Sequence, residues 1–263
     1  MAQIIEYFYT SNVGKCRKTN QDNFFCNGEM MNHKNEGTGE ILHGKVTCEE
    51  EPVFCVFDGM GGEECGEMAA FLAAEEMKNS DFSEGMEKGF RDFCDNANRS
   101  ICAKTEELEI SSMGTTAAIM RFSENESGLC NIGDSKIFLL SDGELTQISL
   151  DHVGISAFGK KPPLLQNLGI PESEMMIDPY VAIGDYRKGD IYLLCSDGLT
   201  DMVELDRIKE ILEKYSGKEA AETLLNEALE NGGRDNVTFI LLYLDNKKQK
   251  RFLKGVWLCL RRK

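Results

Sequence analysis

The sequence predicts an α+β protein in which mainly antiparallel sheets carry helices on their outer faces. Two observations support this prediction. Most apolar, β-branched stretches follow one another as adjacent hairpin-like runs, and the long helical patterns fall between groups of these runs. The chain has 263 residues, of which 41% are hydrophobic, so it can bury a substantial core. A strictly alternating parallel sheet is disfavoured.

Three strands are predicted near the N-terminus. Residues 4–10 and 23–26 are rich in β-branched and aromatic side chains, which favour strands. Residues 53–57 form a continuous apolar run that stops at Asp58-Gly59, as expected of a buried strand that ends in a turn. The intervening residues 29–51 are polar and contain glycine. We expect a loop or an exposed hairpin there.

Further elements follow from the spacing of apolar residues. Helical spacing predicts helices at residues 63–77, 85–108, 206–214 and 218–230. Apolar runs predict strands at residues 115–122, 128–132, 136–140, 145–148, 190–195 and 237–244. Ser141-Asp142-Gly143 is typical of a hairpin turn. Three prolines make residues 151–179 irregular.

The charge of the chain is acidic and unevenly distributed. There are 29 Lys and Arg against 45 Asp and Glu, a formal net charge of −16. Residues 246–263 carry eight basic residues and no acidic one, which leaves 21 basic and 45 acidic residues, or −24, in the body. Nucleic acid and anionic lipid repel such a body, so we expect no nucleic-acid partner. Cation binding is compatible with this charge.

Four aspartates lie where a predicted strand meets a loop: Asp22, Asp58, Asp197 and Asp235. Each one alone is an ordinary turn residue. Together, carboxylates and a glycine carbonyl at strand ends are hard oxygen ligands on a rigid frame, which suits Mg²⁺ or Mn²⁺. Zinc would recruit His or Cys, yet the three histidines are not suitably spaced and the ten cysteines form no CxxC pair. Spacing alone leaves open whether the four aspartates converge.

Six segments, in this order, resemble the metal-dependent protein phosphatases, the type 2C or PPM family, and its bacterial branch in particular. The segments are GKCRKTNQD (14–22), VFDGMGG (56–62), MGTT (113–116), NIGDS (131–135), CSDGLTD (195–201) and GRDNVT (233–238). They span residues 14–244, nearly the whole body. The resemblance implies a four-layer α-β-β-α sandwich of two packed antiparallel sheets, with a centre for two Mn²⁺ or Mg²⁺ ions at one end.

The resemblance also implies roles for particular residues. Asp58 would bridge both metals and the Gly59 carbonyl would complete the shell of one of them. Asp197 and Asp235 would hold the other metal, and Asp22 would act directly or through water.

Three further residues are expected around these ligands. Arg17 matches the residue that clamps the substrate phosphate, for which its forked guanidinium is suited. Asn236 and Gln21 are expected just outside the metal ligands, with Asn236 orienting Asp235.

The chain departs from the family pattern at a few positions. Met60 stands where many eukaryotic members have a histidine that serves as general acid. His152 is a candidate substitute, although a histidine that supports a loop fits its position better. Gln21 replaces a glutamate, and Ser111-Ser112 stand where other members have the aspartate of a third metal. Residues 151–168 are shorter than the flap-bearing segment of many bacterial members.

These features predict a phosphatase domain at residues 1–245 followed by a basic amphipathic tail at 246–263. The activity implied is hydrolysis of phosphoserine and phosphothreonine on proteins, by attack of a water or hydroxide that bridges two metals. The partners expected are phosphorylated proteins, including a Ser/Thr kinase and its substrates. Two alternatives are a weakly active module that binds phosphoproteins, and a phosphatase dedicated to a partner-switching regulator of a sigma factor.

Location and assembly are also predicted. We see no signal peptide and no apolar run of the roughly 20 residues that span a bilayer, so we expect a cytoplasmic location. We also expect a monomer. The tail has two functional interpretations, contact with a membrane surface and docking to an acidic partner. The alternatives are a solvated terminus and a helix folded onto the acidic body.

Overall fold

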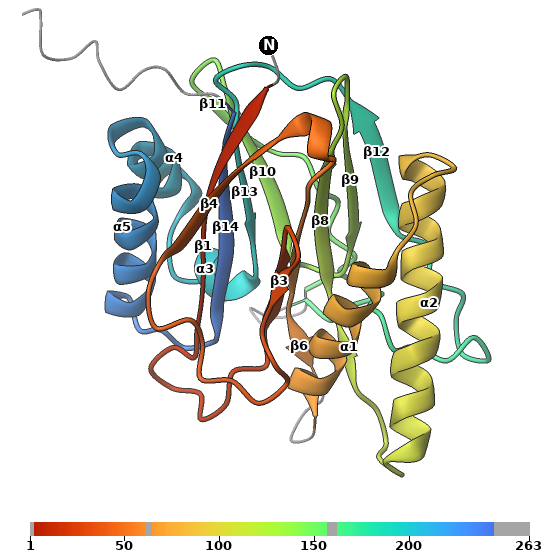
Figure 1. Ribbon diagram of the computed structural model, residues 1–263. Coiled ribbons are helices and arrows are strands. Elements are labelled where there is room, and N and C mark those ends of the chain that lie inside the picture. Colours follow the sequence, from red (N-terminus) through yellow and green to blue (C-terminus); the bar gives the residue numbers. More distant parts are fainter. Residues whose placement is uncertain (1–2, 61–64, 157–161, 245–263) are drawn as a thin grey trace, which may run out of the picture.

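Two six-stranded antiparallel sheets form the centre of the molecule in a computed structural model that describes residues 3–60, 65–156 and 162–244 (Figure 1). Sheet A contains, in spatial order, β11 (Glu144–Gln147), β10 (Lys136–Ser141), β13 (Ile191–Cys195), β14 (Val237–Leu244), β1 (Ile4–Asn12) and β4 (Leu42–Thr47). Sheet B contains β12 (Tyr180–Gly184), β9 (Ser127–Ile132), β8 (Ala117–Phe122), β5 (Val53–Phe57), β2 (Asn23–Cys26) and β3 (Glu29–Met30).

Helices cover the outer face of each sheet. In Figure 1, the orange and yellow α1 and α2 lie on sheet B and the blue α4 and α5 lie on sheet A. The helices are α1 (Gly66–Asn79), α2 (Met86–Glu107), α3 (Asp197–Thr200), α4 (Leu205–Lys214) and α5 (Gly217–Glu230), with a short 3₁₀ turn at Cys48–Glu50. Two short strands, β6 (Gly59–Met60) and β7 (Gly114–Thr115), pair separately. The predicted sandwich is confirmed.

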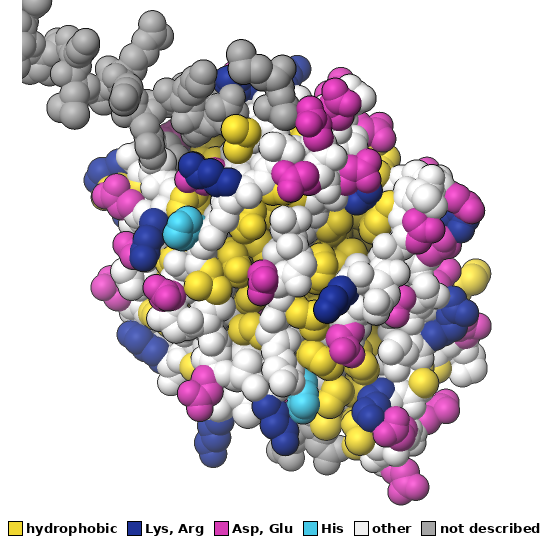
Figure 2. All heavy atoms as spheres, in the orientation of Figure 1, with side chains coloured by type: hydrophobic (Ala, Val, Ile, Leu, Met, Phe, Trp, Pro, Cys, Tyr) yellow, Lys and Arg dark blue, Asp and Glu magenta, His cyan; other side chains and the backbone are white. Residues whose placement is uncertain are grey.

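The molecule has three hydrophobic cores, one between the two sheets and one between each sheet and its helices. They follow from the period-two pattern of the strands. In β14, Phe239 and Leu241 pack with the helices of sheet A, whereas Ile240 and Leu242 belong to the core between the sheets. Each such strand is therefore apolar on both faces, which explains why its sequence is a continuous apolar run. Figure 2 shows apolar side chains gathered in the middle of one face, where the edge strands β3 and β4 lie.

Most predicted elements are confirmed to within a few residues. The hairpin turn between β10 and β11 has the expected geometry, with positive φ at Asp142 and Gly143. The prediction for residues 29–51 was incomplete, because the segment contains β3, the 3₁₀ turn and β4, which pairs with β1 over six residues. Residues 180–184, for which the sequence predicts no element, form the edge strand β12.

The C-terminal boundary of the predicted domain falls at the edge of the described residues. Strand β14 ends at Leu244, and the predicted tail at 246–263 lies outside the described residues, so its boundary stays a prediction. Among the residues the structure describes, no helix is both long and apolar enough to cross a membrane.

Candidate active site

Strand register brings Asp22 and Asp58 to the same end of sheet B. Strands β2 and β5 are antiparallel neighbours in which Asn23 faces Phe57. Asp22 immediately precedes β2 and Asp58 immediately follows β5. The two carboxylates therefore lie at the same end of this strand pair.

The same reasoning places Asp197 and Asp235 at one end of sheet A. Strands β13 and β14 are antiparallel, with Cys195 opposite Phe239. Asp197 begins α3 two residues after β13, and Asp235 lies two residues before β14. Both positions are near the lower end of the sandwich in Figure 1, where α3 and β6 are drawn.

A buried hydrogen bond joins the two sheets at this end. Ser196 Oγ donates to Asp22 Oδ2 at 2.8 Å, and the Asp22 side chain is almost fully buried. The pKa of Asp22 is raised to about 7, mainly by burial; hydrogen bonds from Thr238 and Ser196 lower it, the negative charge of Asp235 raises it, and Arg17 lowers it. A bound divalent cation would favour the charged form of this carboxyl group. The site therefore contains a desolvated carboxylate that a cation would stabilise.

The backbone of Asp58 is fixed by two neighbouring threonines. Its N–H donates to Thr116 Oγ1 at 3.0 Å, and its carbonyl accepts from Thr115 Oγ1 and from the Thr116 N–H, both at 3.0 Å. The Thr116 hydroxyl in turn contacts Ser135 Oγ at 2.6 Å. The GTT and GDS segments thus support the strand end that carries Asp58.

Gly59 lies where no side chain fits. A Cβ atom added there would come within 2.2 Å of the Gly66 carbonyl oxygen and 2.3 Å of the Gln21 carbonyl oxygen. Such distances are well below van der Waals contact, so α1 and the loop before β2 can approach this strand end only because residue 59 is glycine.

Arg17 makes an ion pair with Asp235. Its Nη2 lies 2.7 Å from Asp235 Oδ2, and both side chains are partly exposed. The loop that carries Arg17 is anchored on the segment before β14, since the Lys15 N–H donates to the Gly233 carbonyl at 2.7 Å. The predicted phosphate-binding residue therefore stands directly beside a predicted metal ligand.

Asn236 holds the loop that carries Arg17 in addition to the neighbouring Asp235. Its side chain accepts from the Gln21 N–H at 2.8 Å and donates to the Val13 and Thr19 carbonyls at 2.9 and 3.0 Å. Its backbone N–H donates to Asp235 Oδ1 at 2.9 Å. One buried residue thus positions Asp235 and both ends of the loop that carries Arg17.

Glu67 is a carboxylate near the site that the sequence reasoning missed. It lies in the first turn of α1 and accepts from Gln21 Nε2 at 3.5 Å. The signal available in the sequence was its position just after the Gly-Gly turn, at the start of a helix. Gln21 is thereby placed next to the site, between Asp22 and Glu67.

His152 is engaged in holding a loop. Its backbone N–H donates to the Gly133 carbonyl at 2.9 Å, and its Nδ1 accepts from the Gly133 N–H at 3.2 Å. These contacts fit the interpretation of His152 as a loop-supporting residue. Met60 lies in β6 opposite Gly114.

The oxygen donors at this end suit a hard divalent cation. Within residues 3–60, 65–156 and 162–244, however, no three His, Cys, Asp or Glu side chains stand close enough to hold a metal ion as a group. Two of the carboxylates have partners within the protein: Asp22 accepts a hydrogen bond from the neutral Ser196 hydroxyl, and Asp235 pairs with the positively charged Arg17. In donor type the residues fit Mg²⁺ or Mn²⁺.

Comparison with known proteins identifies the family. Residues 42–231 match the family model described as protein phosphatase 2C, so the chain belongs to that family. It is 31% identical over 252 residues to the serine/threonine protein phosphatase PstP of Mycobacterium tuberculosis, a match that covers 90% of this chain and 45% of the relative. The chain therefore spans about half the length of that relative.

Two further matches cover nearly all of the proteins concerned. The serine/threonine phosphatase stp of Listeria monocytogenes is 30% identical over 244 residues, which are 84% of this chain and 94% of the relative. The crystal structure of the catalytic domain of PstP in complex with two manganese ions superposes with a TM-score of 0.71 at 29% identity, over 92% of this chain and 99% of that chain.

Proposed function

We propose that this chain is a metal-dependent phosphoprotein phosphatase that hydrolyses phosphoserine and phosphothreonine with the help of two Mn²⁺ or Mg²⁺ ions. One observation carries the proposal. In a member of the protein phosphatase 2C family, four aspartates from both sheets come to one end of the sandwich, and an arginine pairs with one of them. The manganese-bound relative supports the choice of metal.

The aspartates and one glycine would hold the metals. Asp58, at the end of sheet B, and the carbonyl of the adjacent Gly59 would bind from one side, Asp197 and Asp235 from sheet A, and Asp22 directly or through water. When bound, the two cations would lower the pKa of water and neutralise phosphate charge. Phosphate monoesters hydrolyse very slowly without such help.

Arg17 would bind the phosphate group of the substrate. Its guanidinium now donates to Asp235, and it would exchange that carboxylate for phosphate oxygens, which accept two parallel hydrogen bonds from the fork. Asn236 would keep Arg17 in place through the loop contacts. Met60 has no proton to donate, so solvent would protonate the leaving alkoxide.

The substrates proposed are phosphorylated cytoplasmic proteins, including a Ser/Thr kinase and its targets, and the enzyme would act as a monomer. A basic tail at 246–263 would add weak contact with a membrane or an acidic partner. The alternatives, a weakly active binding module and a phosphatase dedicated to a sigma-factor regulator, would retain the same site.

The first experiment is hydrolysis of p-nitrophenyl phosphate with Mn²⁺, Mg²⁺ or EDTA. We expect EDTA to abolish the activity. Asp58→Ala and Asp197→Ala should each lower kcat/KM more than about 100-fold, since loss of a residue outside the ligand shell already costs about 10–100-fold. Asp142→Asn is the matched control, because Asp142 lies in the turn after the end of β10 that is remote from Asp197. Activity that survives EDTA or either alanine substitution would overturn the two-metal proposal.

Calorimetric titration with MnCl₂ separates binding from turnover. The native chain and Asp142→Asn should bind Mn²⁺, and Asp58→Ala should bind it much more weakly. A chain that binds Mn²⁺ and phosphoprotein but hydrolyses neither substrate would instead be a binding module.

A further inference from the structure

A groove of about 790 Å³ opens beside the candidate active site. One wall is the end of α2 and the segment that leads to β7; the other is the segment from Asn167 to Glu174. Its volume is that of a typical ligand site. The residues that line it are Met60, Cys102, Thr105, Glu106, Ile110, Ser111, Ser112, Met113, Gly114, Asn167, Gly169, Ile170, Pro171 and Glu174.

The groove lies next to the proposed metal centre. Met60, which lines the groove, directly follows Gly59 and pairs with Gly114 in the β6–β7 ribbon. The next residue, Thr115, donates to the Asp58 carbonyl. A peptide whose phosphorylated residue occupied the centre would therefore have its neighbouring residues at the mouth of the groove.

The far wall of the groove is fixed in place by a buried amide. Asn98 of α2 accepts from the Gly169 and Ile170 N–H groups at 2.6 and 3.0 Å and donates to the Ile170 carbonyl at 2.9 Å. Thr115 and Leu168 exchange two backbone hydrogen bonds at 2.9 and 3.0 Å. The groove is thus formed before any partner binds, which lowers the entropy cost of binding.

Among the described residues that line the groove, the only charged side chains are negative. These are Glu106 and Glu174, and the other side chains are apolar or neutral and polar. Lys104, the nearest basic residue along α2, is 2.7 Å from Glu107. Burial raises the pKa of the Cys102 thiol, and Glu106, Glu172 and Glu174 raise it further, so the carboxylates of both walls act on the same groove residue.

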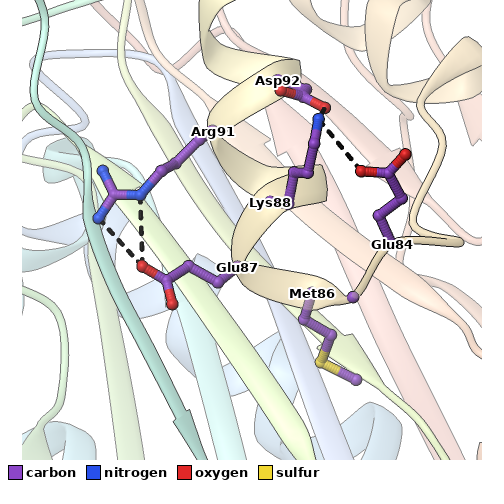
Figure 3. Close-up of a pocket in the computed structure, with 7 residues that line it drawn as sticks. Glu84, Met86, Glu87, Lys88, Arg91 and Asp92 are labelled. Atoms are coloured by element: carbon purple, nitrogen blue, oxygen red, sulfur yellow. Dashed lines mark hydrogen bonds and ion pairs between the residues drawn. The ribbon is translucent and has the colours of Figure 1, made fainter.

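A second hollow, at the N-terminal end of α2, shows the contrast (Figure 3). It has a volume of about 540 Å³ and also carries glutamates. There, Lys88 pairs with Glu84 and Asp92, and Arg91 pairs with Glu87, so each carboxylate has a basic partner within the protein. The 22-residue helix separates the two hollows by roughly 30 Å.

We propose that the groove between the end of α2 and residues 167–174 binds the residues that flank the phosphorylated residue of a protein substrate, and that Glu106 and Glu174 select substrates with Lys or Arg there. The inference rests on the proposed phosphatase function and adds the substrate class. Ile110, Ile170 and Met60 would contact the aliphatic stems of those basic side chains, and the carboxylates would bind their charged ends.

The test compares two phosphopeptides that share one phosphothreonine. One has two arginines on each side of it, and the other has two glutamates. We expect the native chain to hydrolyse the basic peptide with the higher kcat/KM, chiefly through a lower KM. In Glu106→Gln/Glu174→Gln this preference should fall about fivefold, the size expected from two exposed charge pairs. Glu106→Lys/Glu174→Lys should favour the acidic peptide.

The matched control is Glu84→Gln/Glu87→Gln, which removes the same charge from the second hollow and should keep the native preference. Circular dichroism checks that each variant is folded. A native chain without preference, or a preference unchanged in both groove variants, overturns the inference. If the lysine variant instead hydrolyses both peptides and p-nitrophenyl phosphate faster than the native chain, the groove holds a segment of this chain and the inference is wrong.

Failure of the proposed function itself would be distinguishable. In that case the native chain with Mn²⁺ would hydrolyse neither p-nitrophenyl phosphate nor either peptide. An enzyme that hydrolyses p-nitrophenyl phosphate normally but ignores the flanking charges would contradict only the role of the groove.

Discussion

Asp22 is the site residue whose burial most destabilises the folded state when its carboxyl group is charged. The residue is 2% exposed, and the Ser196 hydroxyl donates to its carboxyl group across the two sheets. A charged carboxylate that is removed from water destabilises the folded state unless a cation or several donors compensate. The metal-free protein should therefore be least stable when Asp22 is ionised.

This residue gives a pH-dependent prediction. The pKa of Asp22 is about 7 in the folded chain and roughly 3.9 in an unfolded one. Between these values the folded state binds more protons than the unfolded state, so this group makes stability fall as pH rises from 4 to 7, by about 4 kcal/mol at most. Asp22→Asn should remove that fall, measured by urea unfolding in EDTA at several pH values. An equal pH slope in the native chain and the variant would contradict it.

Individual site residues were predictable only where a motif carries them. The six segments named Arg17, Asp22, Asp58, Asp197 and Asp235 by position. Their present partners were not predictable, because the Arg17–Asp235 pair joins residues 218 positions apart. Glu67 was missed for a similar reason: its relation to the site arises from the packing of α1 on Gly59, which local spacing does not reveal.

Among the elements, the loop before β2 depends on a single side chain. Asn236 makes three hydrogen bonds to backbone groups at both ends of this loop and is 4% exposed. Functional residues often lie on loops that a rigid scaffold positions. Here the residue that positions the loop, Asn236, lies directly before β14. The position of Arg17 is therefore set by a residue that need not touch substrate.

Asn236→Ala should loosen this loop. It leaves three backbone groups without their partner, so we expect the free energy of unfolding to fall by about 2–4 kcal/mol. The KM for p-nitrophenyl phosphate should rise, because Arg17 is no longer held. Asn79→Ala, which removes one exposed bond to the Glu75 carbonyl, is the control and should change neither quantity appreciably. Unfolding in urea and steady-state kinetics measure both, and a native KM in Asn236→Ala would refute the positioning role.

The strands of the two six-stranded sheets that the sequence does not predict share one physical property. Strands β3, β4 and β12 lie at sheet edges, where one side of the strand has no partner. Strand β4, for example, has the sequence LHGKVT with only Val46 fully buried. Edge strands need no continuous apolar run, so tertiary pairing decides them. The central strands, buried on both faces, were recognisable from sequence.

At the scale of the molecule, the proposed ligands come from both sheets. Asp22 and Asp58 lie at the end of sheet B, with Gly59 directly after Asp58, and Asp197 and Asp235 lie at the end of sheet A. A metal bound by both groups would hold the layers together, so binding energy would appear as resistance to unfolding. It would also neutralise part of the −24 charge of the body.

Thermal unfolding tests this coupling. At a Mn²⁺ concentration about 100 times its Kd, the native chain should gain about 2.7 kcal/mol, which is a rise in Tm of several degrees for a chain of this size. NaCl of equal ionic strength should not reproduce the rise. An Asp58→Ala variant that shows the full native shift would argue against a centre shared by the sheets.

The direction of β14 has a practical consequence for handling the protein. This strand starts beside Asp235 and runs eight residues to Leu244, a distance of about 25 Å at the usual rise per residue. A linker attached after Leu244 would emerge from the end of the sandwich opposite the aspartates. Immobilised on a bead or sensor chip through that linker, the molecule would present both its aspartates and its groove to the surrounding solution.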